Sequence, residues 1–290
     1  MYRTLVALGI AVDGIFTVDI ATGAVAQVYA DTGAFPDGLQ IADGVAYWTT
    51  MGAPTHNPKQ QGEAALDFSA RNGGVHSINV DGTDRRDLTA PGDITTGKQL
   101  TLHQGWLYWG DREGHRVSRM RTDGTGREDL VINEPGIENQ CVGVTVDPTG
   151  DYLYWTQKGP AKGGLGKILR APLTIADGAT RPIEVLWDHL PEPIDLEIAE
   201  DALYWTDRGT APLGNTVNRA PLPTPDARGD APQILADGFD EAIGLVVDPE
   251  ATVVYVSDLA GHIYVVPLDG APKRLLADLG TPVTGITGVR

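Results

Sequence analysis

The tetrapeptide Tyr204-Trp205-Thr206-Asp207 recurs, with small changes, four more times along this chain of 290 residues. The copies are spaced at roughly 50 residues, a length typical of one unit in a repeat architecture. This repetition is the feature that decides the fold. The other copies are Tyr47-Trp48-Thr49-Thr50, Tyr108-Trp109-Gly110-Asp111, Tyr154-Trp155-Thr156-Gln157 and Tyr255-Val256-Ser257-Asp258.

Each copy lies within a set of short strands. An alternating segment precedes it, as Leu196 to Ile198 does before Tyr204, and a period of two predicts antiparallel β-strands. A third strand follows, and Asp-Gly pairs such as Asp123-Gly124 supply the positive φ of a tight hairpin turn before a fourth. Four antiparallel strands in each unit of about 50 residues predict the blade of a β-propeller.

Five units are complete, and the sixth has to be assembled from both ends of the chain. Three strands near the N-terminus lack an innermost partner, and Gly285 to Val289 has the pattern of that missing strand. We therefore predict an all-β fold, a six-bladed β-propeller of four-stranded antiparallel blades closed by the C-terminal strand. The single domain 1–290 would have blades at 283–290 with 3–30, 36–90, 97–132, 141–187, 193–236 and 242–277.

The repeated motif resembles the YWTD repeats of lipoprotein-receptor ectodomains, over nearly the whole chain. Thr50 and Gln157 depart from it at the Asp position, and Val256 departs at the Trp position. Animal members of that family lie beside disulfide-rich modules outside the cell. Cys141 is the only cysteine here and cannot form an internal disulfide, which suits a reducing compartment. We expect a stand-alone, cytoplasmic member.

Charge restricts the partners. The formal net charge is −17, which would repel phosphate backbones and anionic membrane surfaces. The apolar stretch from Leu5 to Val12 is too short to span a bilayer. We expect neither nucleic acid nor a membrane as a partner.

The direction of the strands determines which loops share a rim of the propeller. The loops between second and third strands and those between blades lie at one end, which we call the long-loop rim. The Asp-Gly turns lie at the other end, the short-turn rim. An insertion from Met51 to Gly73 lengthens one loop of the long-loop rim. Because binding residues gather on loops held by a rigid scaffold, we expect the working site at this rim, with the insertion as its lid.

Polar residues at the starts of the inner strands, and aromatic residues in the loops of this rim, are the candidates for contacting a ligand. Loop packing for the aromatic rings and solvation for the carboxylates are the alternatives. In architecture the chain is similar to gluconolactonase-like enzymes, which hold a divalent cation on the axis. No matching ligand motif is present, so a divalent cation on the axis is left open. The candidates are Phe35, Asp37, Phe68, Lys98, Asn139, Phe239 and Glu241.

Candidates for acid–base catalysis are fewer. His56 in the insertion and His115 at the end of a loop are the histidines not readily explained by packing, and Glu138 and Asp195 are the carboxylates expected to converge with them. Clustered carboxylates raise at least one pKa unless a metal, a proton or an amine relieves the repulsion.

Three functions fit these patterns. The first is binding of a small organic molecule in the channel at the long-loop rim, with or without a hydrolase, lyase or cyclase reaction on a metabolite. The alternative is a protein- or peptide-binding scaffold without catalysis, and the third is a purely structural or vestigial sensor. A deep pocket closed by the insertion favours the first, and a broad apolar face favours the second.

The motif carboxylates Asp111, Asp207 and Asp258 are expected to be structural. A carboxylate that recurs at the same position of several blades is suited to accepting hydrogen bonds from backbone N–H groups, here expected from a neighbouring blade.

Overall fold

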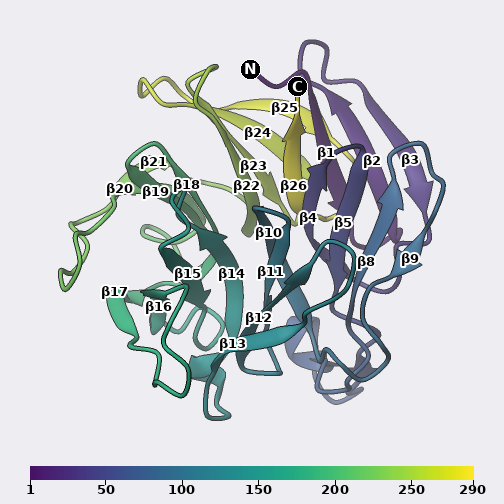
Figure 1. Cartoon of the computed structure of the whole chain (residues 1–290). Coiled ribbons are helices and arrows are strands. Elements are labelled where there is room, and N and C mark those ends of the chain that lie inside the picture. The colour runs from purple at the N-terminus through teal and green to yellow at the C-terminus, as the bar shows by residue number, and fades with distance from the viewer.

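Six four-stranded antiparallel sheets form a ring in the computed structural model, which describes residues 1–290 (Figure 1). The predicted all-β, six-bladed propeller is therefore confirmed. From the axis outward, the first three blades are β26 (Val283–Val289), β1 (Thr4–Gly9), β2 (Gly14–Asp19), β3 (Val25–Ala30); β4 (Pro36–Ala42), β5 (Val45–Thr50), β8 (Gly74–Asn79), β9 (Arg86–Asp87); and β10 (Gly97–His103), β11 (Trp106–Asp111), β12 (Arg116–Arg121), β13 (Glu128–Ile132).

The other three blades have the same order. They are β14 (Cys141–Val146), β15 (Tyr152–Gln157), β16 (Gly166–Pro172), β17 (Glu184–Leu190); β18 (Pro193–Ala199), β19 (Ala202–Asp207), β20 (Thr216–Pro221), β21 (Gln233–Ala236); and β22 (Ala242–Asp248), β23 (Val253–Asp258), β24 (His262–Pro267), β25 (Arg274–Asp278). Neither of the two short 3₁₀ helices, Gly62–Ala65 and Ile137–Asn139, has the length and apolar character needed to cross a bilayer.

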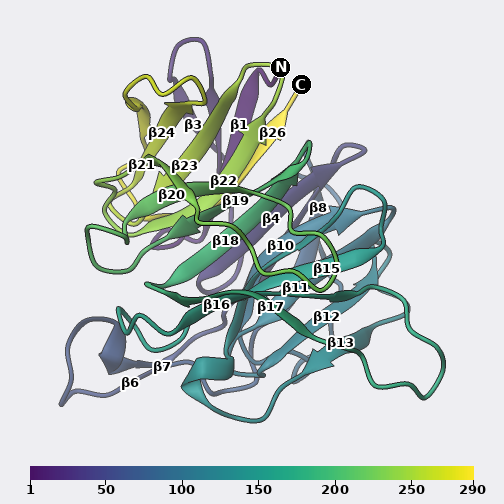
Figure 2. The ribbon, with the colours of Figure 1, turned by 90° about the vertical axis from the view of Figure 1, so that its left-hand side faces the viewer.

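The ring closes through the C-terminal strand, as predicted. β26 pairs antiparallel with β1, placing Val289 opposite Thr4 and Ile286 opposite Ala7. The two termini consequently lie side by side, at the short-turn rim (Figures 1 and 2). Sharing one sheet between both ends of the chain leaves no open edge between the first and last blades.

The third residue of the motif joins neighbouring blades. The Thr206 hydroxyl accepts a hydrogen bond from the Asp195 N–H of its own blade at 3.1 Å and donates one to the Ile243 carbonyl of the next blade at 2.5 Å. Thr49, Thr156 and Ser257 make equivalent bonds to the next blade. Gly110 takes this position in one blade, where a Cβ atom would lie 2.6 Å from the Val142 carbonyl oxygen.

The fourth residue of the motif accepts backbone hydrogen bonds, as predicted, but from a different segment. Asp207 accepts from the N–H groups of Glu192 and Gly209, at 3.0 and 2.8 Å. Glu192 lies in the linker that enters the same blade, so the expectation of a neighbouring blade was wrong. The motif threonines already make the contact between blades.

The core lies between the blades rather than at the axis. The motif side chains Trp48, Trp109, Trp155 and Trp205 are among the largest fully buried ones. The apolar cluster around Trp155, for example, combines Val117 of β12 with Leu169 of β16. Packing of this kind fixes each blade against the next and holds the loops of both rims in place.

The insertion forms a small structure of its own at the long-loop rim. β6 (Thr55–His56) pairs antiparallel with β7 (Leu66–Asp67), and the 3₁₀ helix Gly62–Ala65 lies between them. In Figure 2 this hairpin stands at the end of the molecule away from the termini.

Candidate functional site

A cavity of about 350 Å³ lies at the long-loop rim; we call it the rim cavity. The insertion contributes Met51, Glu63, Leu66 and Phe68 to its wall. Other apolar contacts come from Ile10, Ile243, Leu259 and Pro282, and the charged residues of the scaffold are Asp37, Lys98, Arg112, Arg208 and Glu241.

One side of the rim cavity holds a buried ion pair. Lys98 Nζ donates to Asp37 Oδ2 and lies 3.3 Å from Met51 Sδ. Burial lowers the pKa of Lys98; Asp37 opposes this effect, and the positive charge of Arg112 adds to it. Asp37 is completely buried, and its second oxygen, Oδ1, has no hydrogen-bond partner.

The other side centres on Arg208. Its Nε donates to Glu192 at 2.8 Å, its Nη2 lies 2.7 Å from an oxygen of Glu63, and its Nη1 lies 3.5 Å from Glu241. Burial alone would lower the pKa of Arg208, but Glu63, Glu192 and Glu241 raise it overall. Arg208 is therefore a permanent cation held between carboxylates.

Arg112 lies next to this cluster. Its Nε donates to Glu113 at 2.7 Å, and its Nη1 is 3.5 Å from Glu63. Its guanidinium lies over the Phe68 ring, 5.2 Å from the centroid. Glu63 thus lies between two guanidinium groups that come from different blades.

The predicted site residues omitted these buried cations, although the repeat carries a signal for them. Arg112, Lys158 and Arg208 each directly follow the four-residue motif. That position begins the loop between the second and third strands, so it lies at the long-loop rim in every blade. Lys158 extends the cluster, with its Nζ 3.4 Å from Glu192.

Of the seven predicted ligand-contacting residues, the structure places five around the rim cavity. Phe35 and Phe68 meet edge to face, with centroids 5.2 Å apart. The five are Phe35, Asp37, Phe68, Lys98 and Glu241. Phe239 instead packs edge to face against Tyr264, and the Asn139 side chain donates to the Glu134 carbonyl within its own loop.

The four predicted acid–base residues are not brought together. His56 and Glu138 are exposed, and His115 is half-buried at a loop end with a φ of 54°. None of these three lines the rim cavity. Asp195 lies deeper along the axis and faces a different space.

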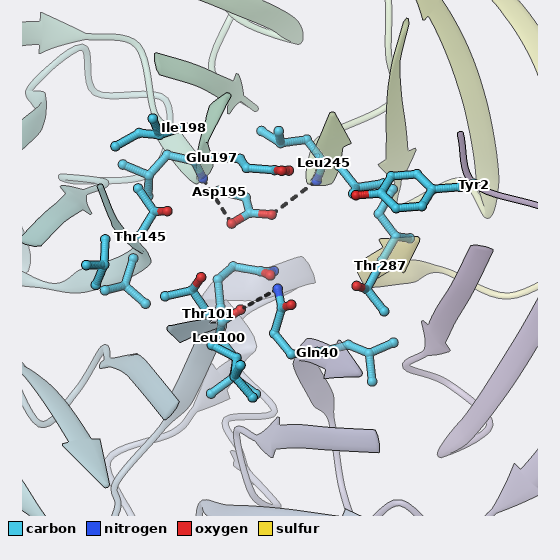
Figure 3. A pocket seen from close by; sticks show the side chains of 18 residues that line it. Tyr2, Gln40, Leu100, Thr101, Thr145, Asp195, Glu197, Ile198, Leu245 and Thr287 are labelled. Atoms are coloured by element: carbon cyan, nitrogen blue, oxygen red, sulfur yellow. Dashed lines mark hydrogen bonds between the residues drawn. The ribbon is translucent and has the colours of Figure 1, made fainter. Parts of the chain in front are cut away.

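That second space, the channel cavity, has a volume of about 230 Å³ within the ring of inner strands. Figure 3 shows Asp195 pointing into it from β18, with Gln40 across the cavity. Asp195 accepts hydrogen bonds from the Leu196 and Leu245 N–H groups, at 2.9 and 3.1 Å. Glu197 accepts from the Val247 N–H at 2.9 Å.

Burial raises the pKa of Asp195 to about 7 and that of Glu197 to about 8. Burial is the main cause of both shifts and repulsion between carboxylates a smaller one, so each carboxyl group is harder to ionise here than in water. No group of three His, Cys, Asp or Glu side chains in the structure is arranged to hold a metal ion.

Comparison with curated proteins gives the family. The chain is 39% identical over 274 residues to the Low-density lipoprotein receptor-related protein 1 of Pyricularia oryzae, covering 87% of this chain and 84% of that protein. The chain belongs to the family of this lipoprotein receptor-related protein. This assignment agrees with the YWTD-type repeat of the sequence and with the six-bladed propeller fold. No model of an established protein family matches the chain.

A second fungal relative is longer than this family member. The 3-hydroxyacyl-CoA dehydrogenase-like protein LAM1 of Cochliobolus heterostrophus is 36% identical over 282 residues, which cover 87% of this chain and 55% of that protein. The chain therefore spans about half the length of this relative.

Solved structures share the fold at low sequence identity. The propeller in the nidogen/laminin complex superposes with a TM-score of 0.71 at 18% identity, covering 98% of this chain and 97% of the other. A putative 6-phosphogluconolactonase from Bacteroides uniformis gives 0.59 at 14%, covering 99% and 83%. A luciferin-regenerating enzyme gives 0.56 at 12%, covering 88% and 76%.

Proposed function

We propose that this propeller binds a small organic molecule in the rim cavity, beneath the insertion. The observation that carries the proposal is the composition of the cavity wall. Apolar and aromatic side chains make up much of it, and a few buried charged groups are held at fixed positions by hydrogen bonds and ion pairs. Pockets for small molecules typically have this composition, with volumes upward of roughly 300 Å³.

The contribution of the insertion supports a small molecule over a large partner. Phe68 and Leu66 come from the insertion, and Phe35 and Leu259 come from loops of two different blades. A ligand between them would contact the insertion and both loops at once. A protein partner would need a broad open surface, and these loops would have to move aside to provide one.

If the bound molecule reacts, Lys98 and Asp37 are the pair we propose for proton transfer. The lowered pKa of Lys98 makes it easier to deprotonate than an exposed lysine. Asp37 accepts a hydrogen bond from Lys98 and could receive the proton. Proton transfer by a positioned side chain is a common contribution to reactions of the hydrolase, lyase and cyclase types.

The comparisons support both small-molecule and protein partners. A putative 6-phosphogluconolactonase and a luciferin-regenerating enzyme share the fold, and one relative is named a 3-hydroxyacyl-CoA dehydrogenase-like protein. The alternative of a protein- or peptide-binding scaffold is favoured by the higher TM-score of the propeller solved with laminin. The mixed apolar and charged wall of the rim cavity makes the small molecule our first proposal.

A crystallographic soak tests this proposal. Crystals would be exposed to a library of small organic compounds that includes acids, amines and neutral molecules. We expect electron density between Phe35 and Phe68 for several of them. Compounds found only on the short-turn rim, or an empty rim cavity with every compound, would contradict the proposal and favour the scaffold.

We also propose a cytoplasmic location. Cys141 is a buried free thiol, and a chain without a disulfide is compatible with a reducing compartment. Microscopy of the fluorescently tagged protein in its source cells tests this directly. A secreted or vesicular signal would contradict it.

A further inference from the structure

Glu63 is a carboxylate of the insertion that neutralises cations of the propeller body. It lies 145 residues from Arg208 in sequence, yet its two oxygens are 2.7 and 3.0 Å from Arg208 Nη2. The Glu63 side chain is 43% exposed, whereas that of Arg208 is 9% exposed. The cations are therefore fixed in the scaffold, while their partner comes from an exposed hairpin.

Both guanidinium groups depend on Glu63 on the side that faces the insertion. Arg112 uses its Nε for Glu113, and its Nη1 faces Glu63. Burial alone would raise the pKa of Glu63, but Arg208, Lys158 and Arg112 lower it overall, which keeps it ionised. Without the Glu63 carboxylate, Arg208 would keep Glu192 and Arg112 would keep Glu113. The guanidinium N–H groups that now face Glu63 would be free for another carboxylate, which such groups bind strongly.

One carboxylate oxygen at the rim cavity lacks a hydrogen-bond donor. Asp37 Oδ2 accepts from Lys98, but Oδ1 has no partner although Asp37 is completely buried. A buried acceptor left without a donor is costly. A hydroxyl group on a ligand would supply that donor.

We infer that the ligand is an organic acid that also carries a hydroxyl group. Its carboxylate replaces that of Glu63 on Arg208 and Arg112, its hydroxyl donates to Asp37 Oδ1, and its apolar body lies against Phe35 and Phe68. Glu63 then acts as an internal competitor that pairs the arginines when the rim cavity is empty. This inference rests on the proposed function and adds the chemical class of the ligand.

Binding measurements with matched probes test the inference. Phenyllactate and mandelate are the hydroxycarboxylates, their primary amides are the uncharged controls, and phenylpropionate and phenylacetate lack the hydroxyl. Isothermal titration near neutral pH would be run with the wild-type protein, with Glu63→Gln, and with Glu134→Gln. Glu134 is exposed in another loop of the same rim, so the last variant removes an equal charge outside the cavity.

We expect at least one hydroxycarboxylate to bind, and to bind about tenfold more tightly than its amide and than its counterpart without the hydroxyl. Glu63→Gln should tighten binding of that acid about fivefold to tenfold and leave the amide unchanged. Glu134→Gln should change neither.

Failure of the inference and failure of the proposed function have different signatures. The inference is overturned if the hydroxycarboxylates bind no more tightly than their amides, or if neither of them binds Glu63→Gln. It is also overturned if Glu63→Gln does not bind the hydroxycarboxylate more tightly than the wild type does. The proposed function would still stand if other compounds occupied the rim cavity in the crystals. If no compound of any charge occupies it, the proposed function fails as well.

Discussion

The Thr206 hydroxyl lies 2.5 Å from the carbonyl oxygen of Ile243, which belongs to the next blade. Ile243 lines the rim cavity, so this bond connects the repeat motif to the position of the site. The same hydroxyl also accepts the Asp195 N–H. The Thr206 side chain therefore fixes the start of the inner strand in its own blade and the start of the inner strand in the next blade.

Replacing Thr206 with valine should destabilise the propeller. The shape is retained, but a buried N–H and a buried carbonyl lose their partner, at a cost of about 1–3 kcal/mol. Chemical denaturation would measure the change in the free energy of unfolding. Thr174→Val, at an exposed threonine, is the control and should have almost no effect. Equal stability of the two variants would contradict this role for Thr206.

Asp207→Ala should reduce stability more than it reduces ligand affinity. Asp207 accepts hydrogen bonds from the Glu192 and Gly209 N–H groups, and leaving buried donors unpaired costs about 1–3 kcal/mol. Thermal melting and titration of a ligand from the library would be measured on the same preparations. An unchanged melting temperature combined with lost binding would assign Asp207 to the site instead.

Deleting the chain from Val283 onward should abolish cooperative folding. The deletion removes β26, exposes the edge of β1, and takes Val283 and Ile286 out of a buried apolar cluster. Circular dichroism during heating would show a broad or absent transition. A truncated protein that melts at the temperature of the full chain would show that this strand is dispensable.

Much of the fold follows from local sequence signals. The period of two and the Asp-Gly turns define the strands, and the resulting parity places Phe35, Asp37 and Lys98 at one rim. The closing strand is predictable because only one segment, Gly285 to Val289, has the missing pattern. These signals act over a few residues, so they do not depend on how distant segments pack.

The remainder of the site depends on contacts that no local pattern encodes. The position of Glu63 beside Arg208 depends on how the insertion folds over another blade. Asp195 lies deeper than expected because it is one residue further along its inner strand than Asp37 and Lys98 are along theirs: the pairs Pro193–Asp207, Pro36–Thr50 and Gly97–Asp111 are equivalent. His56 is exposed since its hairpin projects from the rim.

Stability should fall as the pH rises through the range in which Glu197 ionises. Its pKa is raised from 4.5 to about 8 in the folded protein, so the folded state favours the protonated form. The stabilisation is complete below the unfolded pKa and is lost as the pH rises through the folded one. Glu197→Gln keeps a neutral acceptor and should lose less stability between about pH 5 and about pH 8.

Urea denaturation of both proteins across this pH range is the measurement. Glu200→Gln, at an exposed turn position, serves as the control and should follow the wild type. Parallel curves for wild type and Glu197→Gln would mean that Glu197 has an ordinary pKa and is ionised in the channel cavity.

The central claim is that a small molecule occupies the rim cavity, and a blocking variant tests it most directly. Leu66→Trp places a larger side chain in the cavity from the insertion, outside the blades. Leu165→Trp adds the same side chain at an exposed loop position of the same rim, away from the cavity wall. Isothermal titration of the tightest-binding compound should show affinity lost by more than about tenfold in Leu66→Trp and unchanged in Leu165→Trp. Equal affinity in both variants would place the ligand elsewhere and contradict the account.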